Sequence, residues 1–416
     1  MKNKITNVQG FRDFLPTEKK KRDLVQNIIT KTFETSGFVA LETPVLEKQE
    51  LLLGKYGTEA DKLIYKFEDN GGRALGLRYD QTVPSARVIA QYQNELPKYF
   101  RRYQIQDVFR AEKTQKGRYR QFKQCDIDIY GSISPVSDAE ILSTVYFSLV
   151  NIGFKNIKFF INDRQILMST LEKYATDGVN VFSIIQSIDK LDKMSVEDVK
   201  KELVSKGLPE DNANGALGDI SRAKITEELN TIFAYAKSLG IPEEVLVFNP
   251  VLARGLDYYT GMIFEVISED YKAGSLGGGG RYDNLVEQLV GVPVPAVGFA
   301  FGFDRVVEAS DELGLLDVLD ESSKILVTIM DNLIEESLAV AKIIRESGVA
   351  TEVYTETQDK LGKQLTYANK NNFNYVVIIG EQEVNEGMIT IKEMESGKEV
   401  KIQMGQLENY FVNIVQ

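Results

Sequence analysis

The densest set of side chains suited to chemistry lies in FRAEKTQKGRYRQFKQCDIDIYG, residues 109–131. Strand-like residues 99–110 and 121–130 predict a hairpin with a long basic loop, in which Arg110 and Glu112 share one face of the first strand. The residues that alternate along the second strand also share one face: Phe122, Gln124, Asp126 and Asp128. Arginine can hold a phosphate through two hydrogen bonds, and an aromatic ring can stack on a purine. The hairpin therefore favours a nucleotide with a small polar substrate, although cross-strand ion pairs on a sheet surface would explain the same charges.

A second segment, LARGLDYYTGMIFEV at residues 252–266, places Arg254, Asp257 and two tyrosines before an expected strand. Neighbouring residues of a strand point to opposite faces. We therefore expect one of Tyr258 and Tyr259 to line a pocket and the other to pack. An aromatic-rich strand entry without a binding role would give the same pattern.

Two glycine-rich segments follow. LGGGGRYDNLV, residues 276–286, lacks the G-x-G-x-x-G spacing of a dinucleotide site. Its glycines permit either close approach of the backbone to a ligand or only a tight bend. AVGFAFGFDRVV, residues 296–307, predicts a strand that runs into a helix and carries Arg305.

The composition excludes several kinds of catalysis. The chain has no histidine and a single cysteine, Cys125. A histidine base, a Ser–His pair and a cysteine-rich zinc site are therefore excluded, so catalysis would depend on Arg, Lys, Tyr, carboxylates, backbone groups or a metal held by oxygen. An internal disulfide is excluded as well. Because no secretory segment and no apolar run of about 18 residues occurs, we expect a cytoplasmic protein without a membrane span.

The charge of the chain is uneven. The net charge is −12, but residues 98–123 hold nine Lys or Arg and only two acids, Asp107 and Glu112. An acidic chain is not expected to bind nucleic acid non-specifically along its whole surface, whereas a local surplus of basic residues can bind a polyanion. Residues 98–123 are therefore either a solvated basic face or a segment that handles phosphate.

The order of expected elements indicates two domains. An amphipathic helix at 17–36 precedes strand-like segments, and residues 163–248 look helical, with a capping box that starts at Ser195. From residue 324, KILVTIM, ATEVY and NYVVIIG are compact strands with a helix between the first two, which predicts a small α/β domain with a partly parallel sheet. The acidic stretch LDESSK at 319–324 is the expected boundary.

Together these segments resemble class II aminoacyl-tRNA synthetases, and within them the histidyl-tRNA synthetase family. Residues 109–131 look like motif 2, residues 296–307 look like motif 3, and Pro44 stands at the proline of motif 1. The following segments match the family as well: GFRDFLP near the N-terminus, 76–87, 252–266, 277–286, 361–370 and 380–394. The resemblance implies an α+β catalytic domain at 1–322, with a helical insertion at about 163–248. Its antiparallel six-stranded sheet would be flanked by helices, and an α/β anticodon-binding domain would follow at 324–416.

The resemblance also implies an activity. Such an enzyme activates L-histidine with ATP and Mg²⁺, releases pyrophosphate and loads histidine onto tRNA(His), usually as a homodimer. The residues implied for ATP are Arg110, Glu112, Arg118, Phe122 and Arg305. Those implied for histidine are Asp80, Thr82, Arg110, Gln124, Asp128, Arg254, Tyr258 and Tyr259. Lys113 and Gln115 would meet the acceptor end of the tRNA.

The sharpest implied assignment concerns two arginines. Arg110 and Arg254 would flank the α-phosphate as the histidine carboxylate attacks, so preorganised charge would catalyse the step without a protein base. Asp80, Asp128 and Asp304 stand where many members carry glutamate, which we interpret as a subgroup trait. The rival interpretation is an inactive relative, either a regulatory subunit of histidine biosynthesis or a tRNA-sensing module.

Overall fold

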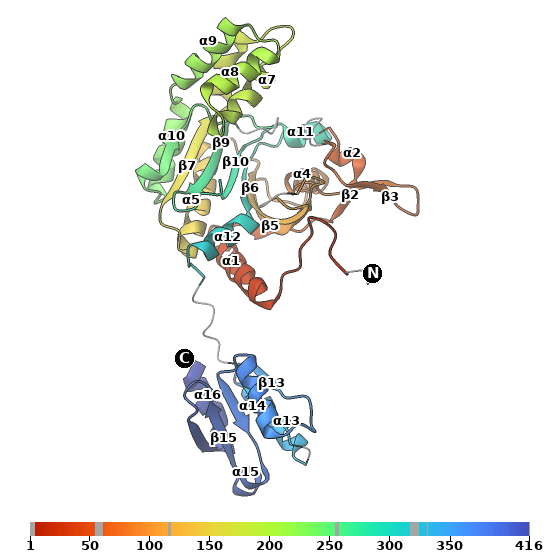
Figure 1. The fold of residues 1–416 in the computed structure, drawn as a ribbon. Coiled ribbons are helices and arrows are strands. Elements are labelled where there is room, and N and C mark those ends of the chain that lie inside the picture. Colours follow the sequence, from red (N-terminus) through yellow and green to blue (C-terminus); the bar gives the residue numbers. More distant parts are fainter. Residues whose placement is uncertain are drawn as a thin grey trace. The chain divides into compact units, whose positions relative to one another are not determined.

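The computed structural model describes residues 5–54, 61–114, 118–253, 258–316, 324–330 and 332–415. The chain divides into two compact units, Met1–Asp317 and Val318–Gln416. Each unit has its own sheet, and each is described by itself below (Figure 1).

An eight-stranded sheet forms the centre of the N-terminal unit. Its strands, in spatial order, are β1 (Val39–Ala40), β5 (Phe100–Phe109), β6 (Gln121–Tyr130), β11 (Ala296–Gly302), β10 (Gly277–Arg281), β9 (Met262–Ser268), β7 (Ile157–Asp163) and β8 (Leu246–Phe248). The six inner strands, from β5 to β7, are all antiparallel, whereas β1 and β8 join the edges in parallel. The expected count of six was therefore wrong by two short edge strands, while the antiparallel core was predicted correctly.

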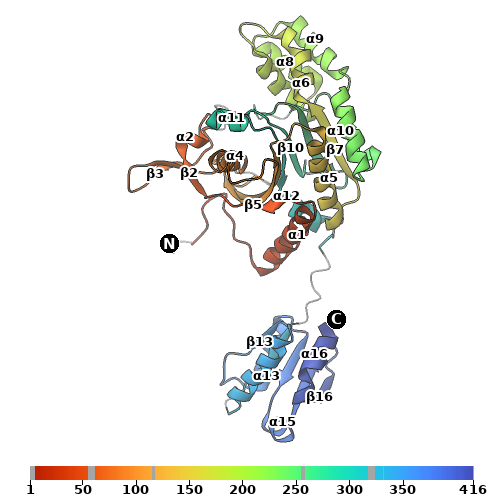
Figure 2. The ribbon, with the colours of Figure 1, turned by 180° about the vertical axis from the view of Figure 1, so that it is seen from behind.

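Helices cover one face of this sheet. α5 (Pro135–Ile152) contacts β6 and β11, and α1 (Pro16–Thr35) and α10 (Glu227–Ser238) flank it (Figures 1 and 2). The apolar residues Cys125, Ile127 and Ile129 of β6 are buried. Residues of even number on β6 point to the other face, because side chains alternate along a strand. The sequence pattern of β6 thus separates an apolar face from one that bears acids.

The second face of the sheet is partly enclosed by smaller elements. α4 (Thr82–Gln91) lies inside the curve of β5 and β6 in both views (Figures 1 and 2). β2 (Leu46–Lys48), β4 (Ala74–Leu77) and β3 (Lys66–Glu68) form a three-stranded antiparallel sheet beside it. α11 (Leu285–Val290) contacts α4, and α12 (Phe303–Glu312) follows β11 directly.

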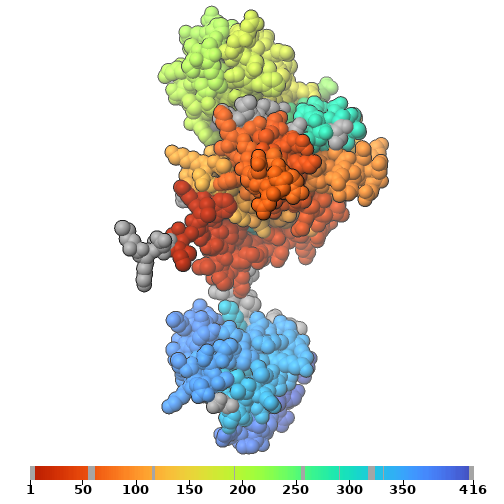
Figure 3. Space-filling model, turned by 90° about the vertical axis from the view of Figure 1, so that its right-hand side faces the viewer, coloured from red at the N-terminus to blue at the C-terminus, as the bar shows by residue number. Residues whose placement is uncertain are grey.

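Residues between β7 and β8 are mainly helical. The helices are α6 (Arg164–Leu171), α7 (Val181–Ile188), α8 (Val196–Ser205), α9 (Glu210–Ser221) and α10. Ser195 caps α8, as expected, because its hydroxyl accepts a hydrogen bond from the Asp198 amide at 3.2 Å. Figure 3 shows this segment in yellow-green, as a lobe at one end of the N-terminal unit.

The C-terminal unit is an α/β fold with a mixed five-stranded sheet, ordered β13-β12-β14-β15-β16. β12 (Ile325–Val327) pairs in parallel with β13 (Thr351–Val353) and β14 (Tyr375–Ile378), while β15 (Met388–Glu393) and β16 (Glu399–Gln403) add antiparallel edges. Its helices are α13 (Ile334–Glu346), α14 (Leu361–Lys370), α15 (Glu381–Glu386) and α16 (Leu407–Val415). Two apolar clusters pack on the sheet, so the expected α/β class is confirmed.

Candidate active site

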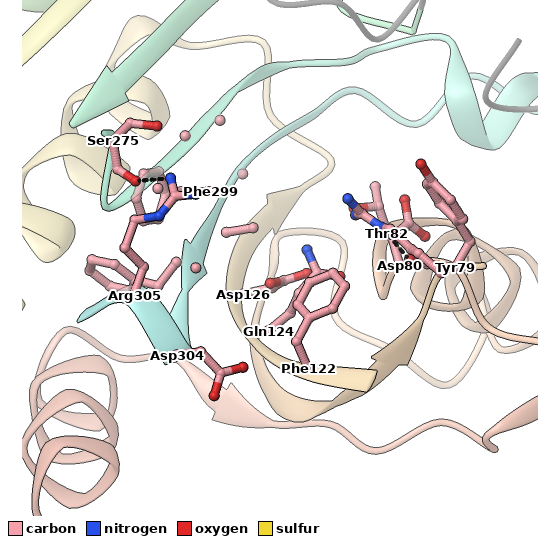
Figure 4. Close-up of a pocket in the computed structure, with 18 of the residues that line it drawn as sticks. Tyr79, Asp80, Thr82, Phe122, Gln124, Asp126, Ser275, Phe299, Asp304 and Arg305 are labelled. Atoms are coloured by element: carbon pink, nitrogen blue, oxygen red, sulfur yellow. Dashed lines mark hydrogen bonds between the residues drawn. The ribbon is translucent and has the colours of Figure 1, made fainter. Parts of the chain in front are cut away.

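A cavity of about 630 Å³ lies on the acid-bearing face of the large sheet. Every described residue that the sequence assigned to ATP or histidine lines it: Asp80, Thr82, Arg110, Glu112, Arg118, Phe122, Gln124, Asp128, Tyr258, Tyr259 and Arg305. Figure 4 shows residues of β6 near the middle, with Tyr79, Asp80 and Thr82 to one side and Ser275 and Arg305 to the other. Lys113 does not line the cavity, and Arg254 and Gln115 lie outside the described residues. Segments far apart in the sequence therefore meet in one space.

The floor of the cavity pairs large polar residues with very small ones. Along the β6–β11 register, Gln124, Asp126 and Asp128 lie opposite Gly302, Ala300 and Gly298. A Cβ added at Gly298 would lie 1.8 Å from Asp128 Oδ1. The glycines of 276–286 form β10, next to β11, so this run is a central strand and not the bend that the sequence left open. The small residues on β10 and β11 leave space above the floor.

Asp128 is the centre of a buried polar network. Its Oδ2 lies 2.5 Å from Arg102 Nη2, and its Oδ1 accepts a hydrogen bond from the Tyr282 hydroxyl. Arg102 also donates to Ser85 on α4 at 2.9 Å, and the Tyr130 hydroxyl lies 2.7 Å from the same serine oxygen. Burial raises the pKa of Asp128, against the attraction of Arg102 and the hydrogen bond from Tyr282. This network anchors the carboxylate firmly.

The basic segment 98–123 is only partly a basic surface. Arg102 is fully buried, and Lys123 is half-buried between α1 and α12. Burial alone would lower the pKa of Arg102, but the nearby Asp128 raises it overall, so the guanidinium stays charged. Part of the local charge therefore holds the site together from inside.

Asp126 is a cavity residue that the sequence analysis placed on the correct face but gave no role. It is 2% exposed, and neither of its carboxylate oxygens has a hydrogen-bond partner among the described residues. Burial raises its pKa well above the usual range, with Asp128 and Asp80 adding to the rise against Arg102 and Arg110. A buried acid in this state is costly, which makes it a candidate for ligand contact.

Arg110 lies beside Tyr79, on the side of the cavity that also holds Asp80 and Thr82 (Figure 4). β5 ends at Phe109, so the prediction that Arg110 and Glu112 lie on that strand was wrong. The Arg110 amide still bonds the Arg120 carbonyl at 2.9 Å, and Ala111 turns toward Leu63. The Arg110 guanidinium donates to the Tyr79 carbonyl at 3.2 Å and lies 5.0 Å from the centroid of the Phe122 ring. It is thus held beside an aromatic face.

The N-terminal segment contacts two residues of the cavity lining, Tyr119 and Asp304. The Gly10 carbonyl accepts the Arg120 amide at 2.9 Å, and the Arg12 guanidinium lies 3.3 Å from the centroid of the Tyr119 ring. Arg12 also pairs with Asp304 at 3.0 Å, and Arg22 joins the same carboxylate. Arg305, next in the chain, donates to the Ser275 carbonyl at 2.6 Å.

The two tyrosines depart from expectation. β9 begins only at Met262, so Tyr258 and Tyr259 lie outside it, and both line the cavity. Their ring centroids are 4.7 Å apart, and Tyr258 also contacts Tyr282 edge-on at 5.7 Å. Both tyrosines line a second cavity of about 510 Å³ near α6 as well. The prediction from strand alternation, that only one would face a pocket, was therefore wrong, whereas the family resemblance had assigned both to the histidine site.

Sequence reasoning missed several residues that line the cavity: Tyr79, Ser275, Tyr282 and Phe299. Tyr282 follows the glycine run and could have been found had that run been assigned to a strand beside β11. Among the described residues, no group of three or more acidic, cysteine or histidine side chains could hold a metal ion. No helix in the described part of the chain is long and apolar enough to cross a membrane.

The chain is similar to known proteins along nearly its whole length. A family model described as histidyl-tRNA synthetase matches residues 10–306, and one described as anticodon binding domain matches residues 324–414. The histidine–tRNA ligase of Wolinella succinogenes is 38% identical, and that of Clostridium tetani is 36% identical, each over 94% of this chain and 94% of its own length. The crystal structure of histidyl-tRNA synthetase from Nostoc sp. PCC 7120 has a TM-score of 0.82 and 28% identity, covering 99% of this chain and 100% of that chain. The chain therefore belongs to the histidyl-tRNA synthetase family.

Proposed function

We propose that the chain is a histidine–tRNA ligase. It activates L-histidine with ATP to histidyl-adenylate and pyrophosphate, and then transfers histidine to the 3′ end of tRNA(His). The observation that carries this proposal is the cavity itself. A guanidinium beside an aromatic ring, Arg110 with Phe122, shares one space with the buried carboxylate Asp128 and the tyrosine pair.

The Arg110 end of the cavity suits ATP. Phe122, Arg305 and Arg110 all line the cavity. Phe122 would stack on one face of adenine, Arg305 would cover the other face, and Arg110 would reach the α-phosphate. Glu112 and Arg118, whose charged atoms lie 3.7 Å apart, would contact the adenine amino group and the terminal phosphates. Because the histidine carboxylate is already ionised, charge stabilisation at phosphorus is the main contribution that the protein must make.

The Asp128 end suits a small cationic amino acid with a polar ring. Gln124, Thr82, Tyr258 and Tyr259 supply donors and acceptors, while Asp80 and Asp128 supply negative charge. A pocket with buried polar groups rejects side chains that leave those groups unpaired. We assign this end to histidine.

Four further parts of the proposal rest on family membership. Arg254 would meet Arg110 at the α-phosphate. Mg²⁺ would arrive with the ATP phosphates, since the described residues offer no carboxylate cluster for it. Lys113 and Gln115 would meet the acceptor end of tRNA(His), and the C-terminal domain would read its anticodon. We further propose a cytoplasmic homodimer with domains at 1–322, including the insertion at about 163–248, and at 324–416.

The inactive alternatives are less well supported. A regulatory subunit or a tRNA-sensing module does not need the residues that would bind ATP. Here Arg110, Phe122 and Arg305 all line the cavity. The two related histidine–tRNA ligases also match this chain over nearly its full length, and the anticodon-binding family model matches its second domain.

Histidine-dependent exchange of pyrophosphate into ATP tests the proposal. We expect exchange with histidine and with no other amino acid, followed by loading of tRNA(His). Arg110→Ala should abolish exchange, while Arg101→Ala should retain it, because Arg101 pairs with Glu140 away from the cavity. A folded wild-type protein that gives no exchange would refute the enzymatic proposal and favour a binding module.

A further inference from the structure

The acids in the cavity are not equivalent. Asp128 accepts a hydrogen bond from Tyr282 on Oδ1, and its Oδ2, which has no hydrogen bond, forms an ion pair with Arg102. Asp80 Oδ1 accepts a hydrogen bond from the Val83 amide at 3.1 Å, at the start of α4. Asp126 lines the same cavity and has no hydrogen-bond partner on either oxygen among the described residues.

The strands that flank Asp126 cannot supply a partner. On β5 the opposite residue is Gln104, whose amide N–H groups are directed to Thr43 at 2.8 Å and to Gln106. On β11 the opposite residue is Ala300, whose side chain has no polar atom. Two buried guanidiniums near Asp126 have other partners: Arg102 pairs with Asp128, and Arg78 donates to the Asp107 and Thr43 carbonyls. The open direction for Asp126 is therefore the cavity, into which Figure 4 shows it pointing.

The negative charge of the Asp126 carboxylate indicates which kind of group should lie beside it in the cavity. A carboxylate buried to 98% without a partner is unfavourable until an opposite charge with N–H donors sits beside it. Histidine carries such a group at neutral pH in its α-ammonium, whereas its ring is mostly neutral. The ammonium also has three donors, which matches the free acceptor sites on Asp126.

We infer that Asp126 binds the α-ammonium group of the amino acid substrate, as a second carboxylate beside those the sequence assigned to histidine. The inference rests on the proposed function, since it names a contact within the same pocket. In this arrangement Asp128 and its partners Arg102 and Tyr282 position the ring, and Asp126 neutralises the substrate's charge. The raised pKa of Asp126 is consistent with this role, because the acid becomes fully stable as an ion only with a cation beside it.

A binding cycle tests the contact. Affinities of histidine and of 3-(imidazol-4-yl)propanoate, which lacks only the ammonium, are measured by calorimetry on the full chain, for the wild type and for Asp126→Asn. We expect Asp126→Asn to weaken histidine by roughly ten- to hundredfold and to leave the deamino compound nearly unchanged. Equal weakening of both ligands would overturn the inference, because it would place Asp126 at the ring or give it a structural role. Unchanged histidine affinity would overturn it as well.

Stability supplies the second readout. Replacing an unpartnered buried carboxylate by an amide of similar shape removes a desolvation cost, so the thermal midpoint of Asp126→Asn should equal or exceed that of the wild type. A lower midpoint would show that the acid holds the fold together and would overturn the inference. Asp126→Ala repeats the cycle without a polar side chain and should give the same pattern.

Asp163→Asn is the matched control. Asp163 is equally buried at the end of β7, but its carboxylate caps α6 by accepting the Gln165 amide at 2.8 Å, outside the cavity. Both ligands should bind this variant as they bind the wild type. Failure of histidine-dependent exchange in the wild type would refute the ligase itself. If the wild type is active with histidine but Asp126→Asn changes the affinities of histidine and of the deamino compound equally, only the Asp126 contact is refuted.

Discussion

Gly298→Ala is the most demanding test of how the floor of the cavity is built. Gly298 lies on β11 opposite Asp128, and an added Cβ would lie 1.8 Å from Asp128 Oδ1 and 2.6 Å from its Cγ. Restoring an ordinary contact of 3.4 Å requires a retreat of the carboxylate by about 1.6 Å. The strand has little freedom to move instead, because β11 pairs with β6 and β10 along its length.

The expected loss of stability follows from the partners of Asp128. A retreat of that size breaks the contact with Arg102, which is fully buried and would be left without its counter-charge. Removing one member of a buried ion pair costs about 3–5 kcal/mol, whereas overpacking alone costs about 1–3 kcal/mol. We therefore expect the larger range, a substantial part of the roughly 5–15 kcal/mol that stabilises a typical domain.

Scanning calorimetry of the full chain is the assay. The two units should melt as separate transitions, and only that of the N-terminal unit should fall, by roughly 5–10 °C. Histidine affinity should also fall at least about tenfold, since the pocket loses its anchored acid. Gly302→Ala is the matched control on the same strand and face, where an added Cβ meets nothing closer than 3.6 Å, so stability should hardly change. Equal stability of the Gly298 and Gly302 variants would refute the reasoning.

The remaining predictions address other parts of the chain. Arg254→Ala should abolish histidyl-adenylate formation while calorimetry still detects histidine binding; equal loss of both would indicate a structural arginine. Phe411→Ala empties a fully buried site in the C-terminal core and should destabilise that unit by about 3–5 kcal/mol. It should impair tRNA loading but spare pyrophosphate exchange, and a loss of exchange would contradict this. Glu202 lies in the last turn of α8, where hydrogen bonds from Lys190, Lys206 and Ser187 outweigh burial and lower its pKa to about 2. Because the folded pKa is depressed, Glu202→Gln should cost about 1–2 kcal/mol at pH 7, and the difference should shrink as the pH falls from 4.5 toward 2 in urea titrations. A difference that is independent of pH would contradict the assignment.

The hairpin of β5 and β6 could be predicted nearly to the residue, because alternating polar and apolar residues specify a strand with one buried face. The same alternation placed on one face the four side chains of β6 that line the cavity. The edge strands β1 and β8 could not be predicted, since two or three residues show no period. The tyrosine pair was misjudged because β9 begins four residues after Tyr258, so strand alternation does not govern it.

The burial and pairing of charged residues were the hardest features to predict from the sequence. Arg102 counted toward a basic surface, yet it is buried against Asp128. That pairing depends on the hairpin register, which places Arg102 directly opposite Asp128. A long connection between two strands does not specify the register from sequence alone, since a slip of one residue would turn every side chain to the other face. Local composition therefore identified the segment that bears charge, but not which charges face one another.

The glycines and the acids of the floor depend on each other. Side chains at Gly298 or Ala300 large enough to fill the space would shield Asp126 and Asp128 from any ligand, and apolar residues in place of the two acids would lower the cost of burial. The chain instead has two buried acids, which is unfavourable for folding, opposite small residues that leave these acids accessible to a cation. Sequences generally accept such a local cost where a ligand later offsets it. Histidine binding should therefore offset the free energy that burial of Asp126 costs. Histidine should raise the melting midpoint of the wild type more than that of Asp126→Asn, because it binds the wild type more tightly.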